Sequence, residues 1–342
     1  MDKIKEGLCS LVQKIKKEGL DSYETDVSKV TREVPINKSI VALNTSGCSY
    51  KKEGVGCFHC GHLKGYEHSE RMFEQFLSDV ERIEEKNKIS IYSNGSFFDS
   101  REISEDSQKA ILQHLKNLGF RQIVLETRPE HIKKERLEKL LNDLDKTELL
   151  VGLGFDTYSD KIRDLCLNKG FLREDYKNAT RILADLNIQF ESRIVIKPPF
   201  LTEREGIDEA IKSVRYAFDR GCEYISLEPI ALQPHTLQDY LHKIGKYRAP
   251  WLWSILSIIS ETHNLGKINI GGENFYPIPY EVAHNCHNCD IRIKTVLKQF
   301  EKTQNIEDIS EISCKCKKEW IYDLKKGAPN LYDRIERVLE KF

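Results

Sequence analysis

The sequence predicts an α/β protein built on a partial (β/α)6 parallel barrel, with a helical, metal-stapled extension towards the C-terminus. Three observations predict this fold: short β-rich runs alternate with longer amphipathic segments, polar residues follow the end of each run, and seven of the ten cysteines fall into two clusters. The expected strands cover residues 40–44, 89–92, 122–126, 149–154, 190–196 and 224–228. Right-handed crossovers would curl such a series into part of a barrel, with functional residues at the carboxyl ends of its strands.

Length and composition are those of an ordinary globular chain. Its 342 residues are 39% hydrophobic and 31% charged, with a formal net charge of -1, so no overall basic field indicates nucleic acid. No apolar stretch reaches the length of a membrane span, which predicts no membrane association. We expect three regions: an N-terminal helical extension (1–36), the partial barrel (37–235), and an aromatic and cysteine-rich region with a zinc-type site (236–342).

The first twenty residues space their apolar side chains as an amphipathic helix does, with lysines distributed along the segment. A signal peptide would instead carry a compact apolar core. We therefore predict a structural helix here. Ten cysteines without an export signal also favour reduced thiols and a cytoplasmic location.

Three cysteines, Cys48, Cys57 and Cys60, lie in a glycine-bearing loop directly after the first expected strand. Four thiolates would saturate a [4Fe-4S] cluster, whereas three leave one iron free to bind and activate a small molecule. The loop therefore predicts a catalytic cluster. A zinc site completed by a histidine is the alternative, and the nearby histidines are His59, His62 and His68.

The ends of the other expected strands carry polar residues that would meet at one mouth of the barrel. For any single residue, a helix cap or turn is an equally good explanation. In chain order, the residues are Ser93, Asn94, Gly95 and Ser96, then Glu126 and Arg128, Asp156, Arg193 and Lys197, and Glu228.

The second cysteine cluster consists of a CxxC and a CxC pair 24 residues apart: Cys286, Cys289, Cys314 and Cys316. Four thiolates form a closed tetrahedral site, and closed sites are structural, so zinc is favoured. A second iron-sulfur cluster, replacement of one thiolate by His284 or His287, and unconnected core cysteines remain open as alternatives.

An aromatic block precedes this cluster. Arg248 and Trp251 lie beside Tyr247, Pro250 and Trp253, a set able to stack on an extruded base. A tryptophan-anchored helix packed against the barrel explains the same residues structurally.

A strand, a three-cysteine loop and an incomplete barrel resemble the radical S-adenosylmethionine (SAM) superfamily. This resemblance implies a [4Fe-4S] cluster whose open iron binds SAM, and an electron donor that reduces it. The first gap of eight residues is longer than the usual three, and Ser93-Asn94-Gly95-Ser96 stands where a Gly-Gly-Glu motif is usual.

Further blocks resemble the radical-SAM subunits of archaeosine synthase (RaSEA) over nearly the whole chain. These are residues 44–48, 93–99, 126–130, 197–200, 247–254, 284–290 and 314–317. The resemblance implies a tRNA substrate, a lysine-transferring partner subunit, and cleavage of the lysine-side C-N bond of a lysine-preQ0 adduct through a 5'-deoxyadenosyl radical.

By their positions, the barrel-mouth residues divide into two groups. Residues 93–96 with Glu126, Arg128 and Arg193 would contact SAM, whereas Asp156, Lys197 and Glu228 with Arg248 and Trp251 would contact the substrate. Two alternative functions remain: an Elp3-like or other radical-SAM modification enzyme, and a non-enzymatic zinc-containing RNA-binding protein.

Overall fold

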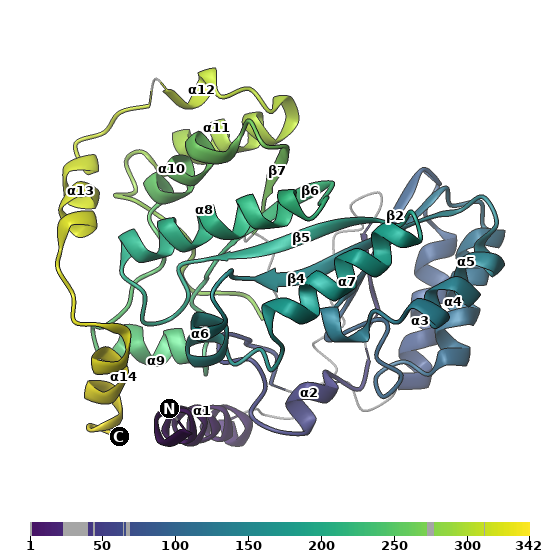
Figure 1. Ribbon diagram of the computed structural model, residues 1–342, viewed down its shortest axis with the longest axis horizontal. Coiled ribbons are helices and arrows are strands. Elements are labelled where there is room, and N and C mark those ends of the chain that lie inside the picture. The colour runs from purple at the N-terminus through teal and green to yellow at the C-terminus, as the bar shows by residue number, and fades with distance from the viewer. Residues whose placement is uncertain are drawn as a thin grey trace.

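Seven strands form one entirely parallel sheet, in the order β1 to β7, that curls into a half-barrel in the computed structural model (Figure 1). The structure describes residues 2–22, 40–43, 45–63, 65, 69–271, 277–310 and 312–342. The strands are β1 (Ile40–Leu43), β2 (Lys88–Ser93), β3 (Gln122–Thr127), β4 (Glu148–Asp156), β5 (Gln189–Ile196), β6 (Tyr224–Pro229) and β7 (Lys267–Ile270). The predicted α/β half-barrel is confirmed, and each of the six predicted strands is present.

Helices lie between the strands and cover the outer face of the sheet, as βαβ crossovers require (Figure 1). Within the barrel they are α2 (Ser49–Lys52), α3 (Ser69–Glu81), α4 (Glu105–Asn117), α5 (Lys134–Leu144), α6 (Asp160–Ile162), α7 (Arg173–Asp185) and α8 (Glu203–Asp219). Beyond β6 follow α9 (Leu237–Lys243), α10 (Leu252–Thr262), α11 (Asp290–Thr303), α12 (Glu307–Ser310), α13 (Lys317–Lys325) and α14 (Leu331–Leu339). None of the described helices combines the length and apolarity needed to cross a bilayer.

The two faces of the sheet differ in chemistry. Alternate strand residues such as Ile91, Leu153 and Ile194 belong to the main hydrophobic core under the helices. The intervening residues face the inside of the half-barrel, where β4 contributes glycine at 152 and 154. Gly152 lies against the side chains of Glu191 and Glu126, so charged groups occupy an interior that a closed barrel fills with branched apolar residues.

Strand β7 was not predicted. It spans Lys267–Ile270, pairs in parallel with β6, and buries Ile268 fully in the main core. Lysine and asparagine occupy two of its four positions, so the segment lacks the β-rich signal of the earlier strands. Pairing with β6, which the local sequence does not reveal, makes it a strand.

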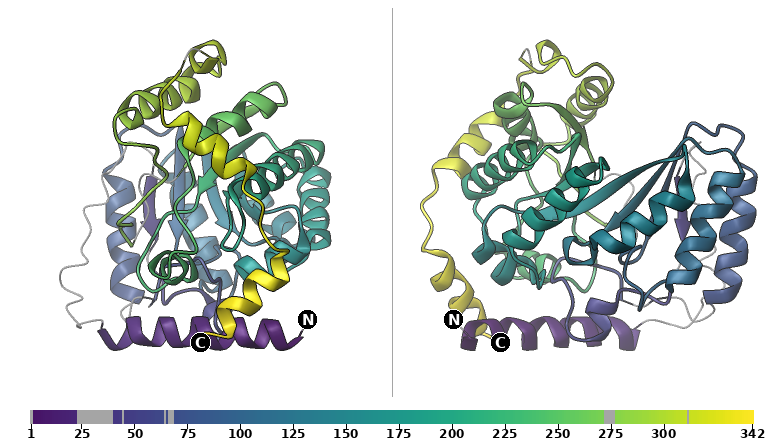
Figure 2. Two further views of the ribbon diagram at one scale, coloured as in Figure 1. Left: turned by 90° about the vertical axis from the view of Figure 1, so that its left-hand side faces the viewer. Right: turned by 45° about the vertical axis from the view of Figure 1, so that its right-hand side comes forward.

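The N-terminal amphipathic segment forms α1 (Asp2–Ser22), which lies along one end of the half-barrel beside the C-terminal α14 (Figure 2). Leu8, Leu11 and Val12 from its apolar face are fully buried in a second core shared with α14. This core also contains Phe58, so α1 packs directly behind the cysteine loop. The predicted boundary at residues 36 and 37 lies outside the described residues.

Candidate functional site

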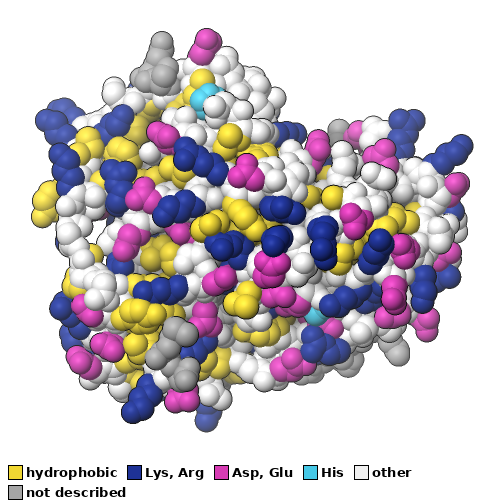
Figure 3. Space-filling view, viewed as in Figure 1, with side chains coloured by type: hydrophobic (Ala, Val, Ile, Leu, Met, Phe, Trp, Pro, Cys, Tyr) yellow, Lys and Arg dark blue, Asp and Glu magenta, His cyan; other side chains and the backbone are white. Residues whose placement is uncertain are grey.

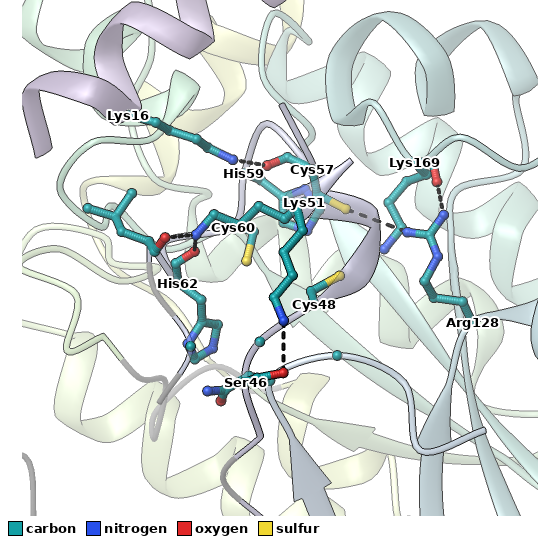
Figure 4. Close-up of a pocket in the computed structure, with 16 residues that line it drawn as sticks. Lys16, Ser46, Cys48, Lys51, Cys57, His59, Cys60, His62, Arg128 and Lys169 are labelled. Carbon is teal, nitrogen blue, oxygen red and sulfur yellow. Dashed lines mark hydrogen bonds between the residues drawn. The ribbon is translucent and has the colours of Figure 1, made fainter. Parts of the chain in front are cut away.

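The three loop cysteines line one cavity of about 360 Å³ at the carboxyl end of β1. Cys48 immediately precedes α2, while Cys57 and Cys60 follow it, and all three are half-buried free thiols whose sulfurs turn towards the same space (Figure 4). Asn94 and Gly95 from the end of β2 line the same cavity. The structure therefore brings together the predicted cluster cysteines and three residues predicted to contact SAM, since Arg128 also lines the cavity.

The cysteine loop is held by backbone bonds to distant parts of the chain. The amide of Phe58 donates to the carbonyl of Leu167 at 2.9 Å, and the Leu237 amide donates to the Phe58 carbonyl at 3.1 Å. The side-chain amide of Asn168 donates to the carbonyl of Gly56, whose φ of 67° favours glycine. These bonds fix the cysteine positions independently of any bound metal.

Among the described residues that line the cavity, the charged ones are all cations: Lys16, Lys51, Lys52, Arg128 and Lys169. Burial lowers the pKa of Lys51 to about 8, while the nearby thiol of Cys60 acts in the opposite direction. A cavity of this charge favours an anionic occupant, which fits a thiolate-bound cluster and the carboxylate of SAM.

Arg128 is fixed beside the cluster loop. Its Nη1 lies 3.9 Å from the Sγ of Cys57, and its guanidinium stacks over the ring of Tyr50 with 4.2 Å to the centroid. It also donates to the backbone carbonyl of Lys169, whose ammonium lies 2.8 Å from the carboxylate of Asp156. Arg128 and Asp156, predicted for different ligands, are thus joined through Lys169.

Glu102 orders the polar loop after β2. Its carboxylate accepts hydrogen bonds from the amides of Ser49 and Ser96, each at 2.8 Å. A Cβ at residue 95 would lie 1.7 Å from Glu102 Oε2, so only glycine fits there. Ser96 is fully buried, and its hydroxyl accepts from the Arg128 amide at 3.1 Å. Glu102 therefore connects the start of α2, directly after Cys48, to the loop at residues 93–96.

Inside the half-barrel, Arg193 of β5 faces three carboxylates. Its guanidinium pairs with Glu126 of β3, lies 3.3 Å from Glu191 of its own strand, and 3.8 Å from Glu228 of β6. The hydroxyl of Tyr92 accepts from it at 3.2 Å. One cation opposite three carboxylates leaves negative charge that a cationic group can neutralise.

Burial is the main influence on the pKa values of two of these carboxylates, Glu126 and Glu228. It raises the pKa of Glu126 to about 8 despite the opposing effect of Arg193, and Glu191 and Glu228 add to the rise. Burial likewise raises the pKa of Glu228. The interior is thus able to hold a proton on a carboxylate near neutral pH, or to exchange it for a cationic ligand.

The contacts of three other predicted substrate residues, Lys197, Arg248 and Trp251, are with other parts of the protein. Lys197 pairs with Glu203 at 2.6 Å and donates to the Arg248 carbonyl, while Arg248 stacks on the Trp251 ring. The Trp251 indole N-H donates to Asp323 at 2.9 Å, and its side chain is buried. These residues join the end of β5 to the C-terminal region, and their predicted contact with substrate remains a prediction.

The four C-terminal cysteines form a compact group. Their sulfurs all lie within 4.8 Å of one another, with 3.7 Å between Cys286 and Cys289, 3.7 Å between Cys286 and Cys314, and 3.6 Å between Cys289 and Cys316. Four ligands 2.3 Å from one tetrahedral ion stand about 3.8 Å apart. The spacing therefore suits a single metal ion.

The loop cysteines are spaced differently. Among the residues that the structure describes, no group of Cys48, Cys57, Cys60 and a histidine has all its ligand atoms within 4.8 Å. His59 is half-buried, and its Nδ1 has no hydrogen-bond partner among the described residues, while His68 lies outside them. The wider spacing suits a polynuclear cluster better than a single zinc ion.

Five residues of the site were not predicted from the sequence: Lys16, Lys51, Glu102, Lys169 and Glu191. Each lies within a helix or strand, or away from a strand end, where a charged residue is usually solvated. In β5, however, Glu191 and Arg193 are two residues apart, and residues at that spacing lie on the same face of a strand. This spacing could have predicted that the two charges lie side by side.

Comparisons with known proteins give a consistent result, although no family model matches. The chain is 30% identical over 306 residues to an uncharacterised protein of Methanocaldococcus jannaschii, covering 85% of this chain and 83% of that one. It is 29% identical to archaeosine synthase subunit beta of Methanosarcina acetivorans, with 85% and 87% covered. For the subunit of the same name in Thermococcus kodakarensis, identity is 25%, with 84% and 91% covered.

Among solved structures, the chain is similar to Elp3 of Methanocaldococcus infernus with its N-terminus deleted. The TM-score is 0.52 at 16% identity, over 78% of this chain and 63% of that one. This likeness concerns the fold, and the chain spans less than two thirds of that protein.

Proposed function

This chain belongs to the family of radical-SAM archaeosine synthase beta subunits, and from that premise we propose that it completes archaeosine in tRNA. The proposed step cleaves the lysine-side C-N bond of a lysine-preQ0 adduct and leaves the amidine on the base. The observation that carries this proposal is the cation-lined cavity, in which three cysteines and the loop after β2 meet at the open end of a polar half-barrel.

The residues of the cavity fit a [4Fe-4S] cluster and SAM. Cys48, Cys57 and Cys60 would hold three irons, and among the described residues no fourth cysteine lines the cavity. When bound, the cluster and SAM together supply the deoxyadenosyl radical that removes hydrogen from the carbon beside the linking nitrogen. Asn94, Gly95 and Arg128 would orient SAM, since they line the same cavity.

The half-barrel interior would hold the lysine part of the substrate. Its side-chain linkage and α-amine are both cationic groups, and the carboxylates around Arg193 provide the complementary charge. Glu228 and Asp156 are the proposed contacts, together with Glu191. Arg193, which pairs with Glu126, would contact SAM through its Nε, which has no hydrogen-bond partner among the described residues.

The C-terminal cysteines would bind zinc as a structural ion. Support comes from sulfur separations of 3.6–3.7 Å, which suit one ion rather than a second cluster. The proposal also includes a tRNA substrate, a lysine-transferring partner subunit, an electron donor and a cytoplasmic location.

The deciding experiment uses protein purified without oxygen. We expect brown protein with about four irons per chain that cleaves SAM under reduction and converts lysine-adduct tRNA to archaeosine, as detected by nucleoside mass spectrometry. Cys57→Ala should lose iron and SAM cleavage, whereas Cys9→Ala, which removes an isolated half-buried thiol, should retain both.

The outcomes separate the alternatives. Colourless protein containing only zinc would contradict an enzyme and favour an RNA-binding module. Active SAM cleavage without archaeosine, in the presence of adduct tRNA, would instead indicate a radical-SAM enzyme with another substrate.

A further inference from the structure

Lys16 is a buried cation on α1 that lies against the cysteine loop. It is 5% exposed, and its ammonium donates to the backbone carbonyls of Val55 at 3.0 Å and Cys57 at 2.8 Å (Figure 4). Among the described residues, no carboxylate forms an ion pair with it. Two neutral carbonyls are its hydrogen-bond acceptors there, so its charge is not neutralised.

A buried ammonium without an anionic partner is unfavourable, because desolvation costs several kcal/mol and carbonyl dipoles compensate only in part. Lys16 lines the same cavity as the three cluster cysteines, Cys48, Cys57 and Cys60, and its ammonium contacts the backbone of Cys57 directly. A charge retained at such a cost needs an anion, and the thiolates of these cysteines are the ones within its field.

Lys51 is a second cation that contacts the cysteine loop, on its other side. Its ammonium donates to the carbonyls of His62 and Leu63, just beyond Cys60. The loop is therefore bound by one ammonium near Cys57 and by a second near Cys60, and in the part of the chain that the structure describes no acidic residue lines the cavity between them. The arrangement is complementary to a negatively charged occupant.

We propose that Lys16 of the N-terminal helix is the counter-ion of the cluster held by Cys48, Cys57 and Cys60. This inference rests on the proposed function, because the compensating charge is that of the cluster. Three thiolates outweigh the charge of the oxidised [4Fe-4S] core, and reduction adds one further negative charge. A fixed cation nearby favours the reduced form and so raises the reduction potential.

The role is one of positioning and electrostatics, and it gives α1 a function beyond packing. Removing the charge should have opposite consequences in the two states of the protein. Without the cluster, an apolar side chain in place of the buried ammonium should cost nothing or stabilise the fold. With the cluster, the same change should disfavour reduction.

The test compares Lys16→Met, which keeps the chain length and removes the charge, with Lys16→Arg, which keeps the charge. Lys17→Met is the matched control, since Lys17 is the exposed neighbour on the same helix. Each variant is measured for thermal unfolding without metal, for iron per chain after anoxic reconstitution, and for cluster reduction by EPR-monitored redox titration.

We expect metal-free Lys16→Met to melt at or above the temperature of the wild type, and its loaded form to have a lower midpoint potential or to take up less iron. Lys16→Arg should keep most of the wild-type midpoint potential and iron content, and Lys17→Met should match the wild type. Equal losses of stability in both forms, with an unchanged potential and iron content, would show that Lys16 is merely structural. Failure of the wild type to bind iron would instead overturn the proposed function itself.

Discussion

Glu102 illustrates how much of the site depends on one side chain that touches neither cluster nor substrate in our proposal. It accepts two backbone amides, at Ser49 and Ser96, and thereby aligns the residue after Cys48 with the loop after β2. Burial raises its pKa, and these two backbone hydrogen bonds oppose the rise. An acceptor of this kind has no equivalent among uncharged side chains.

We therefore expect Glu102→Gln to weaken the site. The amide group can accept with its oxygen alone, so one of the two backbone N-H groups loses its partner, at a cost of about 1–3 kcal/mol. Thermal unfolding should register this loss, and SAM binding by equilibrium dialysis should weaken. Glu105→Gln, on the exposed first turn of α4, is the control. Unchanged stability and SAM affinity would contradict the bridging role.

Glu126 should make stability depend on pH. Burial raises its pKa from 4.5 to about 8, so the folded state binds its proton more tightly than the unfolded chain does. Its contribution to stability is therefore complete below about pH 4.5 and is lost as the pH rises through about 8.

Glu126→Gln should remove this dependence. From pH 5 to pH 9, the stability of the variant should rise relative to that of the wild type by about 4 kcal/mol, as measured by denaturant unfolding at each pH. Parallel pH profiles for the two proteins would show that Glu126 is ionised throughout the range.

At the residue level, site residues could be predicted from the sequence where cysteines are grouped or where polar residues follow the end of a strand. The cysteines of both clusters stand out because thiols are rare and grouped, and Asn94, Arg128, Asp156, Arg193 and Glu228 follow from the rule for parallel strands. Lys16 was not predicted, since a lysine on an amphipathic helix is ordinarily solvated. Its burial arises from contact with a loop forty residues away in the chain.

Among the elements, α1 lies far from the cysteine loop in sequence but packs directly against it in the structure. Its apolar face packs on Phe58, between two cluster cysteines, as well as on α14. The amphipathic pattern predicted the helix but not its location, because such a stripe is equally suited to any apolar surface. Strand β7 is the converse case, since its sequence lacks a strand signal and its pairing with β6 determines its conformation.

Leu11→Ala tests whether α1 supports the cysteine loop. Leu11 is 1% exposed in the core shared with Phe58, and truncation there should cost about 2–4 kcal/mol. We expect a lower melting temperature and less iron retained after reconstitution and desalting.

Gln13→Ala, at an exposed position of the same helix, should leave both quantities unchanged. A Leu11→Ala protein that loses stability yet retains its full iron would show that α1 and the cysteine loop are not coupled.

The whole molecule combines two cysteine sites with separate tasks. The loop cysteines face the half-barrel, whereas the four C-terminal cysteines lie where α11 and α13 begin (Figure 1). Basic and acidic side chains are interspersed over the face seen in Figure 3, in keeping with the formal net charge of -1, so RNA binding would depend on local contacts rather than an overall field.

The C-terminal site also supports the sheet edge formed by β7. Trp253 donates its indole N-H to the Cys316 sulfur at 3.3 Å, and Trp320 donates to Ser254 at 2.9 Å, so α10 and α13 meet around the cysteines. The amides of Ile268 and Ile270 in β7 donate to side chains at the C-terminal end of α11. Loss of a metal here should therefore loosen α13, α11 and β7 in turn.

Cys316→Ser should accordingly separate the two sites. We expect zinc to fall from about one ion per chain to none, and hydrogen exchange to accelerate in α11, α13 and β7. Iron bound at Cys48, Cys57 and Cys60 should remain near the wild-type value, because their loop is anchored by Leu167, Asn168 and Leu237 instead. Lys315→Ala, an exposed change between two of the ligands, is the control for local disturbance. Loss of iron in parallel with zinc would mean that the half-barrel depends on its C-terminal metal for the geometry of the cluster loop.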